Sequence, residues 1–252
     1  MCRRRSECGN LHTLPLPRNR LLTPGTRYRT SPVRVLQVSN HGVVQTIGLK
    51  PVKGLVFRHS VAYNRMPFTK IVTERLALRP LAASDAQKIF EYRSRPEVSR
   101  YQSWGIESRD EIQSQIESLA LTEPGLPGAW YQIGIVLQFS SELIGDCGFH
   151  VLETEPRQVE FGISLAPKYQ CHGYAAEALR ALLNYLFVDL SKHRVFVSVD
   201  PRNLRSIKLM QRVGMRHEAH FIRSLWFKGD WVDDMIFAML ASDWRAGALA
   251  VE

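Results

Sequence analysis

A short apolar strand pattern, followed by a glycine-containing loop and a helix pattern, constrains this chain more than any other feature. Residues 159–178 read Val-Glu-Phe-Gly-Ile-Ser-Leu-Ala-Pro-Lys-Tyr-Gln-Cys-His-Gly-Tyr-Ala-Ala-Glu-Ala. The first N–H groups of a helix lack intrahelical partners, and the helix dipole adds partial positive charge there. Because Gly173 and Ala175 carry little or no side chain, the loop is predicted to bind an anion such as a pyrophosphate. A single Gln-x-x-Gly-x-Ala match also fits an ordinary helix start, so both interpretations remain open.

The residues that follow the loop form the pattern of a crossover unit. A helix is predicted over residues 173–187, because its leucines recur on one stripe that can lie on a sheet. The apolar strand 195–199 is then predicted to run parallel to strand 159–165 through a right-handed crossover. An Asn-x-x-Ser motif, Asn203 to Ser206, opens a second helix that ends before Gly214.

This order of motifs resembles the GNAT family of acetyl-CoA-dependent N-acetyltransferases. The Gln-x-x-Gly-x-Ala loop, the Asn-x-x-Ser motif and Val213-Gly214-Met215 are similar to that family's cofactor-binding half. Residues 226–234, Trp-Phe-Lys-Gly-Asp-Trp-Val-Asp-Asp, resemble the branch that includes the ribosomal-protein N-terminal alanine and serine acetyltransferases. The resemblance covers residues 71–245, so the first quarter of the chain is unmatched.

The expected fold class is α/β (α+β). Pattern and resemblance together imply a GNAT-like mixed, mostly antiparallel twisted sheet of six to seven strands with one parallel pair, flanked by about four helices. The resemblance further implies that the two parallel strands splay apart and leave an edge along which pantetheine adds like an extra strand. The expected strands are residues 76–81, 131–139, 143–152, 159–165, 195–199, 217–227 and 231–240.

The charge of the chain is concentrated in its first 65 residues. The net charge is +9, with 33 basic and 24 acidic residues, yet residues 1–65 hold 12 of the basic residues and one acidic residue. The remainder holds 21 basic and 23 acidic residues and is therefore nearly neutral. Because residues 1–65 contain several prolines and no sustained apolar period, they are predicted to be a basic, disordered extension, and residues 66–252 to be the GNAT N-acetyltransferase domain.

Three accounts of the extension remain open. Its arginines and scarcity of acids fit a targeting presequence. They also fit a nucleic-acid-binding arm. The favoured account is an over-extended reading frame whose true start is Met66, because that residue leads directly into the first family-like strand. The expected location is cytoplasmic, or organellar if residues 1–65 are a presequence.

Composition excludes several other classes. The cysteines follow no disulfide framework spacing, which predicts a reducing compartment: Cys2, Cys8, Cys147 and Cys171. No metal is expected, because the Cys–His pairs at 147/150 and 171/172 lie on different elements. No apolar run approaches the roughly 20 residues that cross a bilayer, so no membrane partner is expected. Nucleic acid is not expected as a partner of the nearly neutral domain, which is predicted to be a monomer or a homodimer.

By resemblance, the reaction is direct attack of an acceptor amine on acetyl-CoA, the co-substrate, in a ternary complex. The family stabilises the oxyanion with a backbone N–H on the strand before the loop, which corresponds to Ile163, Ser164 and Leu165. Asn203 resembles the family asparagine that hydrogen-bonds pantetheine or an ordered water. Lys168 and His172 are available as nearby cations, although His172 could equally be a solvated loop residue. The residues expected to bind the pyrophosphate are Gln170, Cys171, His172, Gly173, Tyr174 and Ala175.

The expected acid and base are less firmly indicated by the sequence. Glu160 is the best candidate base, although a salt-bridged strand residue would look the same. Ser206 is the candidate acid, although Asn and Ser also favour helix N-termini as caps. Met210 stands where many GNAT enzymes place a general-acid tyrosine, and a thioether cannot donate a proton. Ser206 or water then donates, or no acid is needed because a thiol with a pKa of about 8.5 leaves readily.

Tyr101 and Trp104 are the predicted acceptor contacts, because they lie in the region that shapes the acceptor site in the family; ordinary packing is the alternative. The predicted acceptor is a primary amine, either a protein N-terminus or a small molecule. The competing hypothesis is a non-catalytic acyl-CoA-binding or regulatory domain, which Met210 and the lack of an unambiguous base would favour.

Overall fold

The computed structural model describes residues 68–104, 108–119 and 122–249. All of them belong to the second of two compact units of the chain, Ser60–Glu252. The predictions about residues 1–65 and about Met66 as a start lie outside the described residues.

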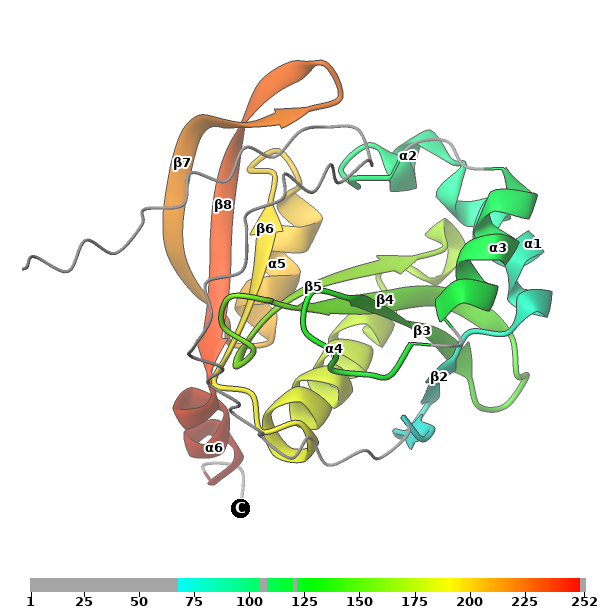
Figure 1. The fold of residues 1–252 in the computed structure, drawn as a ribbon, viewed down its shortest axis with the longest axis horizontal. Helices are drawn as coiled ribbons and strands as arrows, with labels where there is room; N and C mark the ends of the chain where they lie inside the picture. The colour runs from blue at the N-terminus through cyan, green and yellow to red at the C-terminus, as the bar shows by residue number, and fades with distance from the viewer. Residues whose placement is uncertain (1–67, 105–107, 120–121, 250–252) are drawn as a thin grey trace, which may run out of the picture. The chain divides into compact units, whose positions relative to one another are not determined.

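One mixed sheet of eight strands forms the centre of the second unit, in the order β1-β2-β3-β4-β5-β6-β8-β7 (Figure 1). Neighbouring strands are antiparallel except for β5 and β6, which are parallel. The strands are β1 (Ile71–Val72), β2 (Leu76–Pro80), β3 (Trp130–Leu137), β4 (Leu143–Val151), β5 (Gln158–Leu165), β6 (Arg194–Val199), β7 (Arg216–Phe227) and β8 (Asp230–Leu240). The expected fold class is confirmed.

Six α-helices accompany the sheet in the described residues: α1 (Ala86–Arg93), α2 (Pro96–Ser99), α3 (Arg109–Leu119), α4 (Tyr174–Asn184), α5 (Leu204–Arg212) and α6 (Ala241–Leu249). Helix α4 continues into a π-helical turn, Tyr185–Asp189. The sequence predicted fewer elements because β1 has two residues and α2 has four, which is too short to display a hydrophobic period. Helix α6 has nine residues, but its apolar side chains show only a weak helical period.

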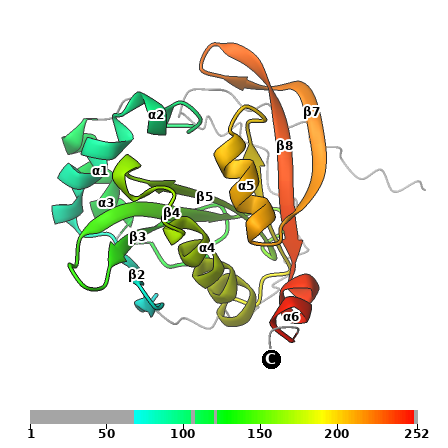
Figure 2. The ribbon, with the colours of Figure 1, turned by 180° about the vertical axis from the view of Figure 1, so that it is seen from behind.

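Apolar side chains form a core on each face of the sheet. Helices α4 and α5 cover one face (Figure 2), where Leu179, Leu182 and Leu183 are fully buried in the same cluster as the β5 residues Val159 and Phe161. Helices α1 and α3 cover the β2–β4 side of the opposite face, where a second cluster is built from Ile89, Ile112, Ile116, Val136 and Leu143. On the β5–β6 side of this second face lie Glu160 of β5 and Phe196 of β6.

The two parallel strands pair over three residues each and then diverge. Their register runs Gln158 to Arg194, Val159 to Val195 and Glu160 to Phe196, and then stops. Beyond that point β5 stays paired with β4 as far as Leu165, and β6 stays paired with β8 as far as Val199. The facing edges of β5 and β6 are thus unpaired with each other where the strands diverge (Figure 1), as the family resemblance implied.

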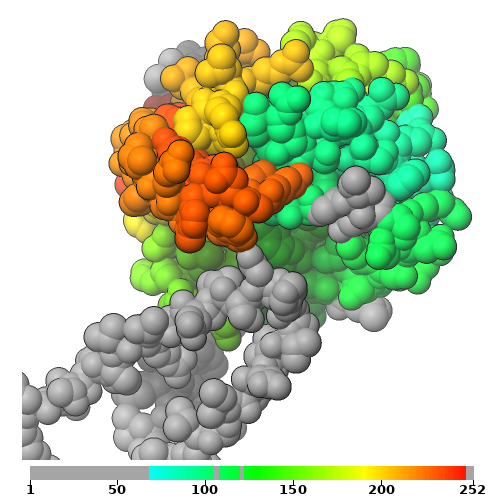
Figure 3. Space-filling model, turned by 90° about the horizontal axis from the view of Figure 1, so that it is seen from above, coloured from blue at the N-terminus to red at the C-terminus, as the bar shows by residue number. Residues whose placement is uncertain are grey.

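The β7–β8 hairpin turns at Lys228 and Gly229, which have φ values of +49° and +88°. Glycine tolerates such a backbone best because it has no Cβ. The Lys228 ammonium donates a hydrogen bond of 2.6 Å to the carbonyl of Ser99, the last residue of α2. Figure 3 shows the orange tip of the hairpin extending toward the green segment that holds α2. The hairpin therefore reaches across the end of the diverging strands.

Candidate active site

The predicted anion-binding loop lies at the end of β5, directly before α4. Gly173 is the N-cap of α4 and has a φ of +84°, a left-handed conformation that L side chains adopt rarely. Cys171 is also left-handed, with a φ of +65°. The N–H groups of the first turn of α4 are therefore presented beside a residue that has no side chain.

Arg75 holds this loop from the turn between β1 and β2. Its Nη1 donates to the His172 carbonyl at 3.1 Å, and its Nη2 lies 2.7 Å from the Glu177 carboxylate on α4. The guanidinium also lies over the Tyr174 ring, 4.7 Å from the ring centre. Burial acts to raise the pKa of Glu177, but hydrogen bonds from Thr73 and Arg75 outweigh it and lower that pKa. Glu177 thus stays ionised and anchors the arginine.

The Gln170 side chain links the loop to the end of β5 and to α5. Its Nε2 donates to the Leu165 carbonyl at 3.0 Å, and its Oε1 accepts from Arg205 of α5 at 2.7 Å. Lys168 instead forms an ion pair with Glu142 at 2.9 Å, so Arg75 and Arg205 are the cations that donate hydrogen bonds to the loop. Sequence reasoning missed Arg205, although its place inside the Asn-x-x-Ser motif puts it on the first turn of α5.

The Asn-x-x-Ser motif begins α5. The Asn203 side-chain oxygen accepts from the backbone N–H of Ser206 at 3.2 Å, so the capping interpretation of Asn203 is confirmed. The cap leaves the Asn203 NH₂ group available as a donor. Ser206 is half-buried, and its hydroxyl makes no hydrogen bond within the described part of the chain.

The end of β5 offers backbone groups rather than side chains. Leu165 is buried in the main core, and Ile163 packs against the same core. The Ser164 side chain is also buried and stands opposite Asp146 of β4 in the sheet register. Because successive residues of a strand alternate their hydrogen-bonding direction, some backbone groups of residues 161–165 face the gap toward β6.

A row of side chains crosses the opposite face of the sheet at the point of divergence. The register places Trp130, His150, Glu160 and Phe196 side by side on β3, β4, β5 and β6. Trp130 stacks on His150 with 5.4 Å between ring centres and 17° between ring planes. Burial raises the pKa of Glu160, His150 opposes the shift, and the charge of Asp234 adds to it. The Glu160 carboxylate therefore binds a proton more readily than an exposed glutamate does.

Open space lies next to Glu160 on this face. The neighbouring row of the register contains Gln132, Gly148 and Gly162. A Cβ added to Gly162 would meet nothing within 4 Å, whereas one added to Gly148 would lie 2.6 Å from the Gln132 carboxamide. The floor beside Glu160 is thus bare at Gly162 and covered by Gln132 at Gly148.

The predicted acceptor residues lie on the segment that follows α2. The Tyr101 hydroxyl donates to the Arg202 carbonyl in the β6–α5 connection at 3.4 Å. The Trp104 ring lies against the Arg93 guanidinium of α1, 4.4 Å from its centre. Tyr101 therefore joins the α2 segment to the β6–α5 connection, while Trp104 lies against α1. The two residues do not share a contact partner among these interactions.

Comparison with known proteins assigns the family. The model of the acetyltransferase (GNAT) domain family matches residues 75–216. The chain belongs to the GNAT acetyltransferase family. An uncharacterized N-acetyltransferase of Bacillus licheniformis, p20, is 30% identical over 179 residues, which cover 69% of this chain and 97% of that protein.

Two further comparisons refine this assignment. The ribosomal protein uS5-alanine N-acetyltransferase of Escherichia coli is 26% identical over 190 residues, covering 73% of this chain and 97% of that enzyme. The crystal structure of a GNAT-family acetyltransferase from Bacillus anthracis superposes with a TM-score of 0.62 at 28% identity, covering 69% of this chain and 99% of that one. The expected resemblance to the ribosomal-protein acetyltransferase branch is confirmed, and this GNAT protein is an acyltransferase.

Met210 has a structural place in this GNAT domain. Its side chain is 1% exposed and packs in the main core, so the position at which many GNAT enzymes carry a tyrosine offers no proton donor. Within the described ranges, no group of three His, Cys, Asp or Glu side chains is arranged to hold a metal ion. The helices of those ranges include none that is long and apolar enough to cross a membrane.

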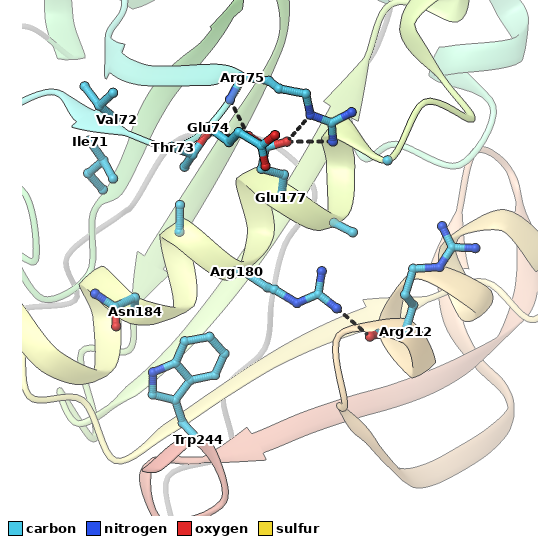
Figure 4. A pocket seen from close by; sticks show the side chains of 13 residues that line it. Ile71, Val72, Thr73, Glu74, Arg75, Glu177, Arg180, Asn184, Arg212 and Trp244 are labelled. Carbon is cyan, nitrogen blue, oxygen red and sulfur yellow. Dashed lines mark hydrogen bonds and ion pairs between the residues drawn. The ribbon is translucent and has the colours of Figure 1, made fainter. Parts of the chain in front are cut away.

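A cavity of about 660 Å³ lies along α4 of the GNAT domain (Figure 4). Arg75, Arg180 and Arg212 line it together with Trp244 of α6, and it extends to Gly173. Arg180 donates to the Arg212 carbonyl at 3.0 Å and so links α4 to the end of α5. The row of Trp130, His150, Glu160 and Phe196 does not line this cavity, which is therefore separate from the face of the sheet that carries Glu160.

Proposed function

We propose that this enzyme transfers the acetyl group of acetyl-CoA to a primary amine by direct attack in a ternary complex. The observation that carries the proposal is the position of Glu160, half-buried at the last pair of the parallel register and beside open space over Gly162. The acceptor is a protein N-terminal amine or a small-molecule amine. Similarity to an enzyme named for alanine acetylation of ribosomal protein uS5 supports the former.

The residues around the gap fit acetyl-CoA. The unpaired edges of β5 and β6 beyond Glu160 leave backbone donors and acceptors for the amides of pantetheine. The first-turn N–H groups of α4 and the cationic Arg205 suit the pyrophosphate, and the free NH₂ of Asn203 suits a pantetheine carbonyl. When bound, acetyl-CoA supplies the activated thioester carbonyl.

Three groups of the chain would then perform the chemistry. Glu160 accepts a proton from the acceptor ammonium, and its raised pKa makes it a better base near neutral pH. Backbone N–H groups of Ile163 to Leu165 donate to the developing oxyanion. The Ser206 hydroxyl, or water beside it, returns a proton to the leaving thiolate.

The surroundings of Glu160 favour a cationic acceptor. Asp234 of β8 interacts electrostatically with Glu160 and accepts a hydrogen bond of 2.6 Å from Ser198 on β6. Tyr101 and Trp104 approach from the α2 segment and would contact the body of the acceptor. Cys147 and Cys171 are free thiols, which supports a reducing compartment such as the cytoplasm.

A thiol-release assay tests the function. The full chain is incubated with acetyl-CoA and a panel of N-terminal peptides, polyamines and aminoglycosides, in parallel with Gly173→Glu and Gly229→Glu. We expect acceptor-dependent release of CoA that Gly173→Glu abolishes, because a carboxylate at the helix start repels the pyrophosphate. Gly229→Glu changes a hairpin glycine of similar φ and controls for backbone strain. Tight acetyl-CoA binding without turnover on any acceptor would contradict the proposal.

A further inference from the structure

A second cavity, of about 320 Å³, lies between α1, α3 and β3. It is on the same face of the sheet as Glu160, because α1 and α3 pack against that face. Pockets for small ligands span roughly 300–1,000 Å³ and are mostly apolar. The walls of this cavity include the apolar Ile89, Ile112, Ile116 and Leu119, and its polar members are Arg93, Gln115, Ser118 and Gln132.

Trp130 and Gln132 connect this cavity to the open space beside Glu160. Both line the cavity. Trp130 also stacks on His150, the register partner of Glu160, and the Gln132 carboxamide covers Gly148, the register partner of Gly162. Neighbouring strands lie about 4.8 Å apart, so β3 is roughly 10 Å from β5, the reach of about three extended residues. In a peptide whose amine meets Glu160, the Cα of the second residue lies about 5 Å from that amine, so an extended side chain at that residue can span the remaining distance to Gln132.

Two buried polar atoms have no hydrogen-bond partner within the described ranges: Gln132 Oε1, on a residue that lines the cavity, and Trp104 Nε1, on a residue outside its lining. Buried polar atoms are nearly always paired in native proteins. Arg93 joins the two residues, because it lines the cavity with Gln132 and lies against the Trp104 ring. One atom accepts and the other donates, which complements the N–H and C=O of peptide groups. A protonated alkyl polyamine offers donors only and leaves the Trp104 N–H unmatched.

We propose that this cavity is a subsite for the side chain of the acceptor's second residue, that this residue is apolar, and that Gln132 and Trp104 bind the acceptor's peptide groups. The inference rests on the proposed function and narrows it. It names the acceptor as a peptide with a free N-terminus followed by an apolar residue.

Calorimetric titration of the full chain, saturated with CoA so that no turnover occurs, tests the subsite. The probes are the tripeptide amides Ala-Leu-Ala and Ala-Asp-Ala, and spermidine. We expect Ala-Leu-Ala to bind at least about tenfold more tightly than either other probe, since burying an unpaired carboxylate is costly. Gln132→Met and Trp104→Phe each remove one hydrogen-bonding group, and each should weaken Ala-Leu-Ala binding about tenfold.

Matched controls carry the same substitutions away from the cavity. Gln113→Met changes a glutamine of α3 that bonds to the exposed Glu117, and Trp244→Phe changes a tryptophan of α6. Both should leave the affinity for Ala-Leu-Ala unchanged. The CoA titration of each variant reports whether it is folded, and Trp104→Phe provides an independent test if Gln132→Met fails to fold.

The outcomes separate the subsite from the proposed function. Equal affinity for the leucine and aspartate peptides, or variants that bind as the parent does, would overturn the subsite. A chain that binds no peptide also overturns it, whatever its turnover of other amines. A chain that binds Ala-Leu-Ala through Gln132 but never releases thiol from acetyl-CoA would retain the subsite and sink the acetyltransferase assignment.

Discussion

Glu160 of β5 and Phe196 of β6 form the last register pair before the two parallel strands separate. The Glu160 carboxylate therefore lies where the gap between β5 and β6 begins. On one side of it the two strands are paired, and on the other side their facing edges are unpaired with each other. Because a strand alternates its side chains, Glu160 projects to the acceptor face while the next residue, Phe161, is in the core. Substitution of Glu160 should therefore affect the chemistry at the opening without disturbing the core.

Glu160→Gln should lower kcat by about a hundredfold, the effect of losing a general base, and leave the affinity for acetyl-CoA unchanged. The amide keeps the shape of the side chain but cannot accept the proton. Steady-state kinetics with the best acceptor measure the loss. Glu153→Gln, at an exposed position after β4, is the matched control and should behave as the parent. A Glu160→Gln enzyme of full activity would remove Glu160 from the mechanism.

The same substitution should stabilise the protein at alkaline pH. Burial raises the pKa of Glu160 in the folded state, so ionising it there is less favourable than in the unfolded chain. The contribution of this group is greatest below its unfolded pKa, near 4.3, and is lost as pH rises through the folded pKa. We expect the Tm of Glu160→Gln to exceed that of the parent more at pH 8 than at pH 4. The reverse trend would mean that the native fold favours the ionised form.

The anion-binding loop and strand β5 could be predicted from the sequence, because the conformation of each is determined by residues close together in the chain. Gly173 is needed where the backbone turns left-handed before α4, and the alternation around Glu160 follows from the strand period alone. The partners of these residues could not be predicted in the same way. Arg75 reaches Glu177 across 102 positions, and the sheet register alone brings Trp130 and His150 beside Glu160.

The partner of Lys168 could not be predicted from its position in the sequence. It precedes the loop by a few residues, and its ammonium lies 2.9 Å from Glu142 at the β3–β4 connection. Arg205, 35 positions beyond Gln170, bonds to the Gln170 side chain of the loop. A long side chain selects its partner from all elements within reach, and that choice is fixed by tertiary packing.

Gly173→Ala should weaken acetyl-CoA binding by about tenfold or more. The residue has a φ of +84°, and an added Cβ would lie 3.3 Å from Arg75 Nη2. Relaxing that strain, worth about 1–2 kcal/mol, shifts the N–H groups that face the pyrophosphate. Gly229→Ala has the same backbone strain at a φ of +88° with no atom within 4 Å of the new Cβ. It should lose similar stability and keep its acetyl-CoA affinity; a parallel loss of affinity would make strain alone responsible.

Arg75→Ala should raise the Kd for acetyl-CoA severalfold and leave the KM of the acceptor unchanged. The side chain holds the His172 carbonyl and Glu177 together but lies on the far side of the loop from the acceptor face. Its removal frees the loop instead of deleting a substrate contact. Arg157→Ala breaks an Arg–Glu pair with Glu155 between β4 and β5 and serves as the control. Equal effects of the two variants on cofactor binding would refute a positioning role for Arg75.

Asp146→Ala should destabilise the fold by about 3–5 kcal/mol, the cost of breaking a buried ion pair by removing one of its members. Asp146 is 3% exposed, accepts from Arg93 at 2.6 Å, and also accepts from the Tyr92 hydroxyl. Denaturant unfolding measures the loss. Tyr92→Phe removes a neutral donor and should cost less, about 1–3 kcal/mol, because the ion pair survives. If Asp146→Ala costs no more than Tyr92→Phe, the Arg93 charge is balanced by other groups, and the α1 end of the acceptor face does not depend on this pair.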